Sequence, residues 1–259
     1  DWQALTSHSH GIILVTGPTG SGKTTTLYSS LKQLATEQVN VCTIEDPIEM
    51  LEPCFNQMQV NTGIDLGFAD GVRALMRQDP DIIMVGEIRD HDTANMAIQA
   101  ALTGHLVLST LHTNDAPSSL TRLHDLGVQP FLTAATILGV LAQRLVRRLC
   151  PHCKVEKQIN SQEWEHLTFD YIMEMPEKVF TAVGCDECRQ TGYKGRVGIY
   201  EFMPVSLEAK QLIGANGDLT ALRQQAKKEG IEPLRIAGAR KVLEGVTTLE
   251  EVLRVVPLN

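Results

Sequence analysis

The stretch Gly17-Pro18-Thr19-Gly20-Ser21-Gly22-Lys23-Thr24 fits the pattern G-x-x-x-x-G-K-[ST] of a phosphate-binding loop. It follows an apolar run, Ile12–Val15, and precedes a helix-like stretch that begins at Thr25. Glycines let consecutive backbone N–H groups surround phosphate oxygens, and the helix that follows directs its positive dipole end at them. Lys23 is expected to reach the β- and γ-phosphates, and Thr24 to ligate Mg²⁺. The alternative is a glycine-rich turn with an incidental lysine, but residues 17–25 are the predicted nucleotide-binding residues.

Short apolar runs alternate with helical patterns along the first half of the chain. Buried parallel strands are predicted at Gly11–Thr16, Val39–Glu45, Asp81–Gly86 and His105–Thr110. Helices are predicted at Lys23–Ala35, Phe68–Arg77, Thr93–Leu102 and Ala116–Leu126. This order is typical of an α/β sheet with helices on both faces, where nucleotides bind at the carboxyl ends of the strands.

Carboxylates follow two of these predicted strands. Glu87 comes directly after Asp81–Gly86, where a buried strand would deliver an acid beside the phosphate loop to hold Mg²⁺ or its waters. Glu45, Asp46 and Glu49 crowd after the second strand, which suits metal coordination and the orientation of an attacking water. The simpler alternatives are that Glu87 caps the next helix and that the three acids belong to a solvated proline turn.

A polar group follows the last predicted strand, in Ser109-Thr110-Leu111-His112-Thr113-Asn114. His112 or Thr110 is placed there to sense the γ-phosphate. A single histidine is more often a structural residue, so this role depends on the neighbouring motifs.

The composition limits the class of protein. With 259 residues and 43% apolar residues, the chain can bury a full core. Its net charge of −8 argues against a broad nucleic-acid surface, and Arg144–Arg148 is interpreted as a solvated helix end or a subunit contact. No run approaches the roughly 20 apolar residues of a membrane span, and Asp1-Trp2-Gln3 has neither the basic start nor the apolar core expected of a leader. A soluble intracellular protein is expected.

Four of the six cysteines form two C-x₂-C pairs, Cys150/Cys153 and Cys185/Cys188, separated by 31 residues. Each pair can supply two thiolates, so the four can close a tetrahedral structural Zn²⁺ site with no open position for catalysis. Unmetallated thiols are the alternative, and Cys42 and Cys54 have no partner spacing.

Four motifs together resemble the Walker A, Asp box, Walker B and His box of the secretion ATPase superfamily. They are the phosphate loop, Thr43–Glu49, Val85–Asp90 and Gly104–Asn114, in family order. Within that superfamily the chain is similar to the type II secretion and type IV pilus assembly ATPases of the GspE and PilB type. Paired cysteines occur in these assembly ATPases and not in retraction ATPases, so the resemblance favours an assembly motor.

The resemblance implies a homo-hexameric, Mg²⁺-dependent ATPase at the cytoplasmic face of an inner-membrane platform, where it powers pseudopilus or pilus assembly. By position, Lys23 and Thr24 would bind phosphate and Mg²⁺, and Glu87 would be the Walker B acid. Glu49 is the preferred activator of water, with Glu45 and Asp46 as neighbours, and His112 lies in the phosphate-sensing box. ATP, Mg²⁺ and Zn²⁺ are the expected cofactors, and no nucleic acid is expected.

Four arginines are further candidates for contact with a nucleotide. They could reach the nucleotide of a neighbouring subunit or pair instead with nearby acids, and they are Arg73, Arg77, Arg89 and Arg122. The turn and strand Gly192–Glu201 would by resemblance close over the base, with Arg196 as a stacking residue.

Three regions are expected: a RecA-like P-loop ATPase core over residues 1–149, a tetracysteine zinc subdomain over 150–190, and a strand with a small helical bundle over 191–259. By resemblance the chain is a C-terminal motor fragment, expected to bind nucleotide and hydrolyse it poorly alone. Type II secretion is preferred over a type IV pilus. A nucleic-acid translocase or a nucleotide-gated adaptor on the same core are the alternatives.

Overall fold

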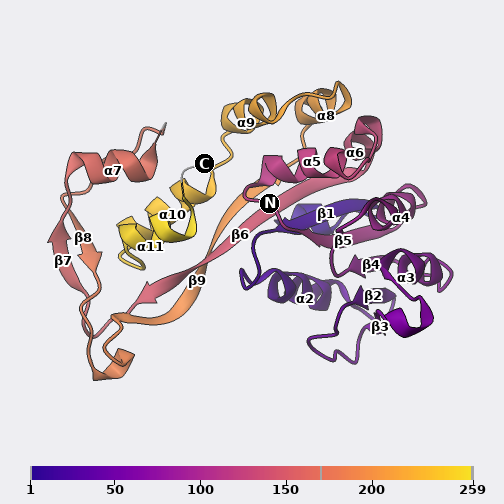
Figure 1. The fold of residues 1–259 in the computed structure, drawn as a ribbon, viewed down its shortest axis with the longest axis horizontal. Coiled ribbons are helices and arrows are strands. Elements are labelled where there is room, and N and C mark those ends of the chain that lie inside the picture. The colour runs from indigo at the N-terminus through magenta and orange to yellow at the C-terminus, as the bar shows by residue number, and fades with distance from the viewer. Residues whose placement is uncertain (1, 170, 258–259) are drawn as a thin grey trace. The chain divides into compact units, whose positions relative to one another are not determined.

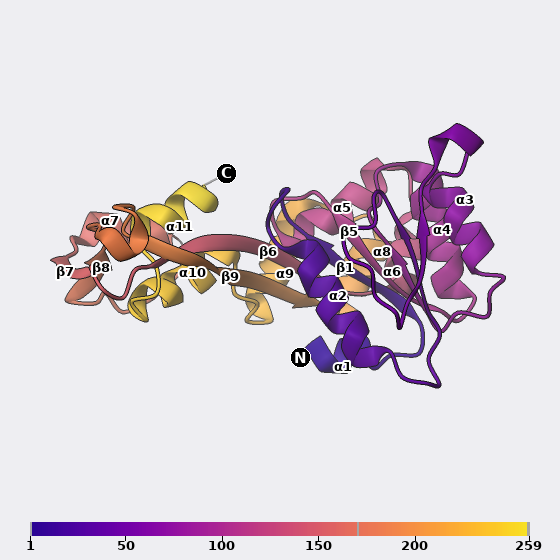
Figure 2. The same cartoon turned by 90° about the horizontal axis from the view of Figure 1, so that it is seen from below.

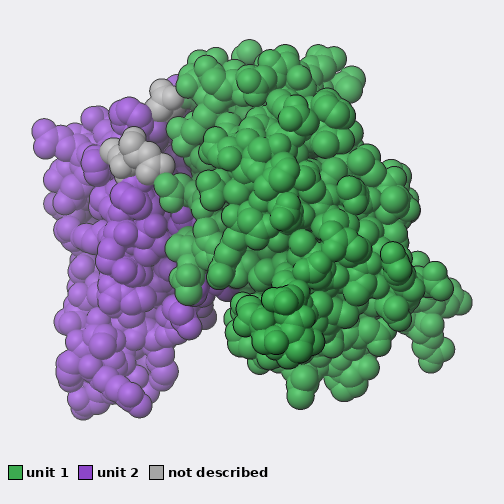
Figure 3. Space-filling view, turned by 45° about the vertical axis from the view of Figure 1, so that its right-hand side comes forward, with its two compact units in different colours: residues 1–19, 23–142, 202–231 green, residues 20–22, 143–201, 232–259 purple. Residues whose placement is uncertain are grey.

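The chain divides into two units in the computed structural model, which describes residues 2–169 and 171–257 (Figures 1 and 3). Unit 1 comprises residues 1–19, 23–142 and 202–231, and unit 2 comprises residues 20–22, 143–201 and 232–259. Two long strands, β6 (Ile137–Leu149) and β9 (Tyr193–Pro204), contribute residues to both units.

A seven-stranded sheet runs in the order β3-β2-β4-β5-β1-β6-β9. Its first five members are β1 (Gly11–Thr16), β2 (Val41–Glu45), β3 (Asn56–Gln59), β4 (Ile82–Val85) and β5 (Leu106–Leu111). Neighbouring strands from β3 to β6 pair in parallel. Strand β9 is antiparallel to β6, because Val205 N–H donates to Leu138 O at one end and Cys150 N–H donates to Gly192 O at the other. The carboxyl ends of the parallel strands therefore meet at one edge of the sheet.

The parallel strands form as continuous apolar runs because both of their faces are covered. Every residue of β1, β2, β4 and β5 is buried. On one face, Ile13 and Val15 of β1 join Leu27, Tyr28 and Leu31 of helix α2 (Lys23–Leu34) in a single core cluster. Helices α2 and α5 lie on opposite sides of β1 in Figure 1, and α2 stands in front of β1 in Figure 2.

Two other helices of unit 1, α4 and α5, begin where an aspartate caps them. Asp90 accepts from Thr93 N–H at the start of α4, and Asp115 accepts from Ser118 N–H at the start of α5. The remaining elements of unit 1 are α1 (Trp2–Thr6), the 3₁₀ turn η1 (Thr62–Ile64), α3 (Phe68–Leu75), α4 (His91–Leu102), α5 (Ala116–Asp125), α6 (Pro130–Thr136), α8 (Leu207–Gly214) and α9 (Leu219–Lys228).

Unit 2 has a separate, smaller core. Strands β7 (Val155–Gln158) and β8 (Lys178–Thr181) form an antiparallel pair, and helix α7 (Ser161–Thr168) lies between them in the chain. The 3₁₀ turn η2 (Asp186–Cys188) and helices α10 (Leu234–Leu243) and α11 (Leu249–Val255) complete the unit. Its buried core consists of Ile159, Trp164, Leu167, Val179, Ala239, Val242, Leu249 and Val252.

The α/β class, the four-cysteine cluster and the C-terminal helices are confirmed. Every predicted strand and helix of the sheet region is present within a few residues of its expected ends. The interpretation of Arg144–Arg148 as a helix end was wrong, since these residues lie in β6 and Arg144 is buried. The C-terminal helices are divided, with α8 and α9 in unit 1 and α10 and α11 in unit 2.

Candidate nucleotide and metal sites

The phosphate loop connects β1 to α2, as its sequence predicts. Gly17, Gly20 and Gly22 have φ values of 151°, 76° and 88°, in the region that favours glycine. Lys23 Nζ donates to the carbonyl oxygens of Gly17 (2.8 Å) and Pro18 (3.2 Å). The lysine ammonium is thus folded onto the loop from which it would reach a phosphate.

Two features of the loop fit a bound phosphate. Ser21 Oγ is buried and has no hydrogen-bond partner among the described residues, as expected for a hydroxyl that awaits an anion. Gln143 Nε2 donates to Ser21 O (2.7 Å), and a Cβ on Gly22 would lie 2.8 Å from the same nitrogen. Gln143 therefore supports the loop, and the φ of 88° at position 22 favours glycine there.

Glu87 follows β4 and is almost buried. Its Oε1 pairs with an Arg89 guanidinium nitrogen at 2.5 Å, and its Oε2 lies 3.5 Å from His112 Nε2. The Walker B and His box candidates, predicted separately from the sequence, are thus brought together at the carboxyl ends of β4 and β5.

The imidazole of His112 is held toward its neutral form. Burial lowers its pKa most, and the positive charges of Lys23 and Arg89 lower it further, while Glu87 acts in the opposite direction. A neutral imidazole beside Glu87 can donate or accept a hydrogen bond without adding charge.

Hydrogen bonds between strand ends fix this edge of the sheet. Thr113 N–H donates to Thr16 Oγ1 (2.8 Å), and Thr16 Oγ1 donates to Leu111 O (3.1 Å). The hydroxyls of Ser109 and Thr110 donate to Val85 O and Gly86 O, each at 2.7 Å. Thr110 therefore links β5 to the end of β4.

The three acids after β2 have different environments. Glu45 is buried, and its carboxylate accepts from Tyr28 Oη (2.6 Å), Thr43 Oγ1 (2.7 Å) and Gln57 Nε2 (3.2 Å). Asp46 and Glu49 are exposed. The exposure of Glu49 leaves its carboxylate accessible to water, whereas the oxygens of Glu45 are occupied by protein donors.

The four predicted zinc ligands converge in unit 2. All four Sγ atoms lie within 4.8 Å of one another, with 3.9 Å between Cys150 and Cys185 and 3.8 Å between Cys153 and Cys188. Four sulfurs bound tetrahedrally at about 2.3 Å from one ion are about 3.8 Å apart. The cluster therefore fits a single Zn²⁺ ion.

Backbone N–H groups prepare the sulfurs for a cation. Gly184 N–H donates to Cys153 Sγ (3.3 Å), while Cys185 N–H (3.2 Å) and Gly192 N–H (3.1 Å) donate to Cys188 Sγ. Burial raises the pKa of the Cys185 thiol to about 11, whereas at Cys188 the hydrogen-bond donors outweigh burial and lower the pKa to about 6, so Cys188 is the thiol of this pair that is held toward the thiolate. Cys42 is buried and Cys54 exposed, both outside the cluster.

The candidate arginines are dispersed. Arg73 pairs with Asp70 at 2.7 Å on α3, and Arg77 and Arg122 are exposed. Arg196 is an exposed residue of β9 in unit 2. Only Arg89, through Glu87, touches another predicted site residue among the described contacts of these arginines.

Sequence reasoning missed Tyr28 and Gln57, which hold Glu45. Tyr28 lies one helical turn after Thr24, and a tyrosine so close to a phosphate loop was the only available signal, since its burial is known only from the structure. Gln57 lies on β3, whose polar sequence Asn56–Gln59 has no apolar alternation and gave no strand prediction.

Comparison with known proteins agrees with these sites. The family described as "Type II/IV secretion system protein" matches residues 1–254. The type IV pilus assembly ATPase TfpB of Acinetobacter baylyi is 81% identical over 258 residues, covering 100% of this chain and 44% of that protein. The type II secretion system protein HxcR of Pseudomonas aeruginosa is 52% identical over 251 residues, covering 97% of this chain and 50% of that protein. The chain thus spans about half the length of the curated relatives it matches.

A solved structure, the pilus retraction motor PilT with bound ADP, shares the fold with a TM-score of 0.71 and 29% identity. The match covers 96% of this chain and 62% of the PilT chain. Across residues 2–169 and 171–257, no helix is long and apolar enough to cross a membrane. The family match over nearly the whole chain, the identities and the shared fold together place this chain in the Type II/IV secretion system protein family of ATPases.

Proposed function

We propose that the protein is a type IV pilus assembly ATPase that hydrolyses ATP with Mg²⁺ to drive fibre assembly. The 81% identity to TfpB over the whole chain carries this proposal. Relatives named for type II secretion are 52% and 53% identical, so the preference for secretion drawn from the sequence has weaker support than the pilus alternative.

The phosphate loop and the acids that follow β2 and β4 supply the proposed hydrolytic site. The loop amides, Ser21 and Lys23 would hold the phosphates, and the Thr24 hydroxyl would hold Mg²⁺ with Glu87. Bound Mg²⁺ would neutralise charge that develops on the phosphate oxygens. Glu49 would orient and deprotonate the attacking water, and His112 would respond to the γ-phosphate beside Glu87.

The four cysteines would hold Zn²⁺ as a structural ion. Four thiolates complete a tetrahedral shell, so no position is left for a reacting water. The distances between the sulfurs and the backbone donors to them support this role.

The proposed setting is a homo-hexamer bound to an inner-membrane platform at its cytoplasmic face. Arg89 would reach the nucleotide of a neighbouring subunit in that assembly, and Arg196 would stack on the nucleotide base. A nucleic-acid translocase is disfavoured by the net charge of −8.

The test is ATP turnover of the full-length natural protein with Mg²⁺, measured against protein concentration with and without single-stranded DNA. Lys23→Ala should reduce turnover to the assay background, because phosphate charge is no longer neutralised. Turnover per molecule that rises with concentration and ignores DNA supports the motor. Stimulation by DNA would favour the translocase.

A cellular arm separates the two fibre systems. In the native host, Lys23→Ala should abolish surface pili and leave secretion of type II substrates intact. The reverse result would restore the secretion assignment.

A further inference from the structure

The hydroxyl of Tyr28 connects four parts of unit 1. It donates to Glu45 Oε2 at the end of β2 (2.6 Å), lies 3.1 Å from Met50 O, and accepts from Gln57 Nε2 on β3 (2.9 Å). Tyr28 itself belongs to α2, the helix that begins at Lys23. The phenol thus joins the phosphate-loop helix to the strand and loop that carry the acids.

The loop from Asp46 to Glu52 is held at alternate residues by side chains of β3. Gln59 Oε1 accepts from Ile48 N–H (3.1 Å), Gln57 Nε2 donates to Met50 O (2.9 Å), and Gln57 Oε1 accepts from Glu52 N–H (2.8 Å). Lys32 of α2 also pairs with Glu52. Because Ile48 and Met50 are the two neighbours of Glu49, its backbone is fixed on both sides although its side chain is exposed.

We propose that Tyr28 and Gln57 are positioning residues that hold the Asp46–Glu52 loop against α2 and thereby align the Glu49 carboxylate for ATP hydrolysis. This inference rests on the proposed function. The nucleotide end of α2 and the acid-bearing loop then share one hydrogen-bonded junction, so the distance from phosphate to carboxylate is set by the hydroxyl of Tyr28. Glu45 acts as the buried acceptor of that junction and not as a ligand of the nucleotide.

The ring and the hydroxyl of Tyr28 have separable tasks. The ring packs in the core, with an edge-to-face contact to Phe55 at a centroid distance of 5.7 Å. Phenylalanine would keep that packing and remove only the oxygen. Burial, followed by the Glu45 carboxylate, raises the pKa of Tyr28, so the phenol remains a donor at every working pH.

The experiment measures kcat, KM and nucleotide affinity of the full-length protein for Tyr28→Phe, Gln57→Met and the double variant. Misplacing a catalytic group by a fraction of an ångström slows chemistry more than it weakens binding, so kcat should fall roughly tenfold in each single variant. KM and the Kd of a non-hydrolysable ATP analogue should stay within about twofold of wild type. The double variant should be no slower than about the slower single variant, because both act through one junction.

Thr136→Val is the matched control. Thr136 is a buried hydroxyl of unit 1 whose only described bond is to Leu132 O in its own helix, so its loss should leave kcat unchanged. Wild-type kcat in Tyr28→Phe, or a loss of affinity that parallels the loss of kcat, would overturn the positioning role. An inactive wild-type protein that still binds the analogue would instead overturn the proposed function itself.

Discussion

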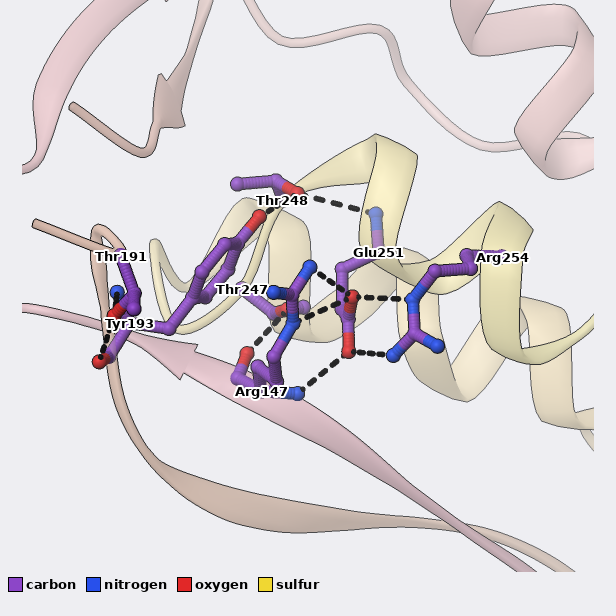
Figure 4. A network of polar contacts seen from close by, with 7 residues as sticks. All are labelled: Arg147, Thr191, Tyr193, Thr247, Thr248, Glu251 and Arg254. Carbon is purple, nitrogen blue, oxygen red and sulfur yellow. Dashed lines mark hydrogen bonds and ion pairs between the residues drawn. The ribbon is translucent and has the colours of Figure 1, made fainter. Parts of the chain in front are cut away.

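Two buried glutamates show how differently the two units stabilise a buried carboxylate. Glu45 in unit 1 accepts from a phenol, a hydroxyl and an amide, and all of its described partners are neutral. Glu251 in unit 2 is held by two guanidinium groups (Figure 4). Arg147 contributes its backbone N–H (3.0 Å), Nε (3.0 Å) and Nη2 (2.8 Å), and Arg254 contributes Nε (2.9 Å) and Nη2 (2.7 Å).

The difference reflects what each carboxylate must hold. The apolar core of unit 1 extends along the sheet and supplies most of its stability. The hydrogen bonds to Glu45 therefore serve to position a loop. Unit 2 has a small core, and Glu251 fastens α11 to β6 through charge. A buried carboxylate needs such compensation to remain ionised. Unit 2 should accordingly depend on ionic and metal contacts, and unit 1 on packing.

The largest expected effect is at the cysteine cluster. Cys150 and Cys153 precede β7, and Cys185 and Cys188 follow β8, so the cluster closes the base of the hairpin that carries α7. Cys153→Ser should release zinc and destabilise unit 2 by more than about 4 kcal/mol, because metal binding is coupled to folding. The measurements are zinc content and denaturant unfolding, followed by the fluorescence of the buried Trp164 in a Trp2→Phe background.

Cys54→Ser is the matched control, since Cys54 is exposed and lies outside the cluster. It should leave both zinc content and the unfolding midpoint unchanged. Full stability of Cys153→Ser would show that unit 2 does not depend on a metal, and the contrast with unit 1 would fail at this point.

The order of β1, β2, β4 and β5 and of the helices between them was predictable because each of these strands is a short, mostly apolar run that is fully buried. Strand β9 lies where the strand within Gly192–Glu201 was expected, whereas β6 was not predicted. The arginines of β6 cluster toward its end without a period of two, and nothing in the sequence separates buried Arg144 from exposed Arg148. The polar strand β3 gave no signal, because its role is to donate and accept side-chain hydrogen bonds.

The candidate site was predictable where a motif carries its own chemistry, as in the phosphate loop and the paired cysteines. The contacts that support it were not. Tyr28 and Gln57 are 29 residues apart, and Gln143 and Ser21 are 122 residues apart, so only the fold brings each pair together. The ionic contact from Arg147 to Glu251 likewise spans 104 residues.

A smaller effect is expected from the Glu251 carboxylate and should depend on pH. Burial acts to raise its pKa, but the hydrogen bonds and charges of Arg254 and Arg147 lower it from 4.5 to about 2. A carboxylate whose pKa is lower in the folded than in the unfolded state stabilises the fold at pH values above its unfolded pKa. This stabilisation is lost as the pH falls toward the folded pKa. The free energy of unfolding of wild type should exceed that of Glu251→Gln by about 3 kcal/mol at pH 7. This difference should shrink between about pH 4.5 and pH 2.

Both proteins are followed through Trp164, and subtracting their unfolding free energies at each pH removes contributions they share, including zinc release by acid. A gap that stays constant with pH would show that the carboxylate is not charged in the fold. Arg254→Gln provides a second check, because it leaves Arg147 in place and should reduce the gap only in part.

The smallest expected effects are the losses of stability on removing one tyrosine hydroxyl from each unit. Tyr193→Phe removes a 3.0 Å contact between its hydroxyl and Thr248 Oγ1, while the ring keeps its place under the Arg147 guanidinium, 4.0 Å from the centroid. A bond between two neutral hydroxyls contributes about 1 kcal/mol, whereas a donor to a charged acceptor contributes about 1.5–3 kcal/mol.

Tyr28→Phe should therefore destabilise unit 1 by about 2 kcal/mol and Tyr193→Phe should destabilise unit 2 by about 1 kcal/mol. Trp2 reports unit 1 in a Trp164→Phe background, since its indole donates to Ser30 Oγ of α2 at 2.9 Å, and Trp164 reports unit 2 as before. Equal losses of stability in the two variants would mean that groups other than these neutral donors stabilise Glu45. The two carboxylates would then not be held differently. A larger cost at Tyr28 follows only if neutral donors are all that keep Glu45 buried, which is the arrangement that lets one phenol fix the acid-bearing loop.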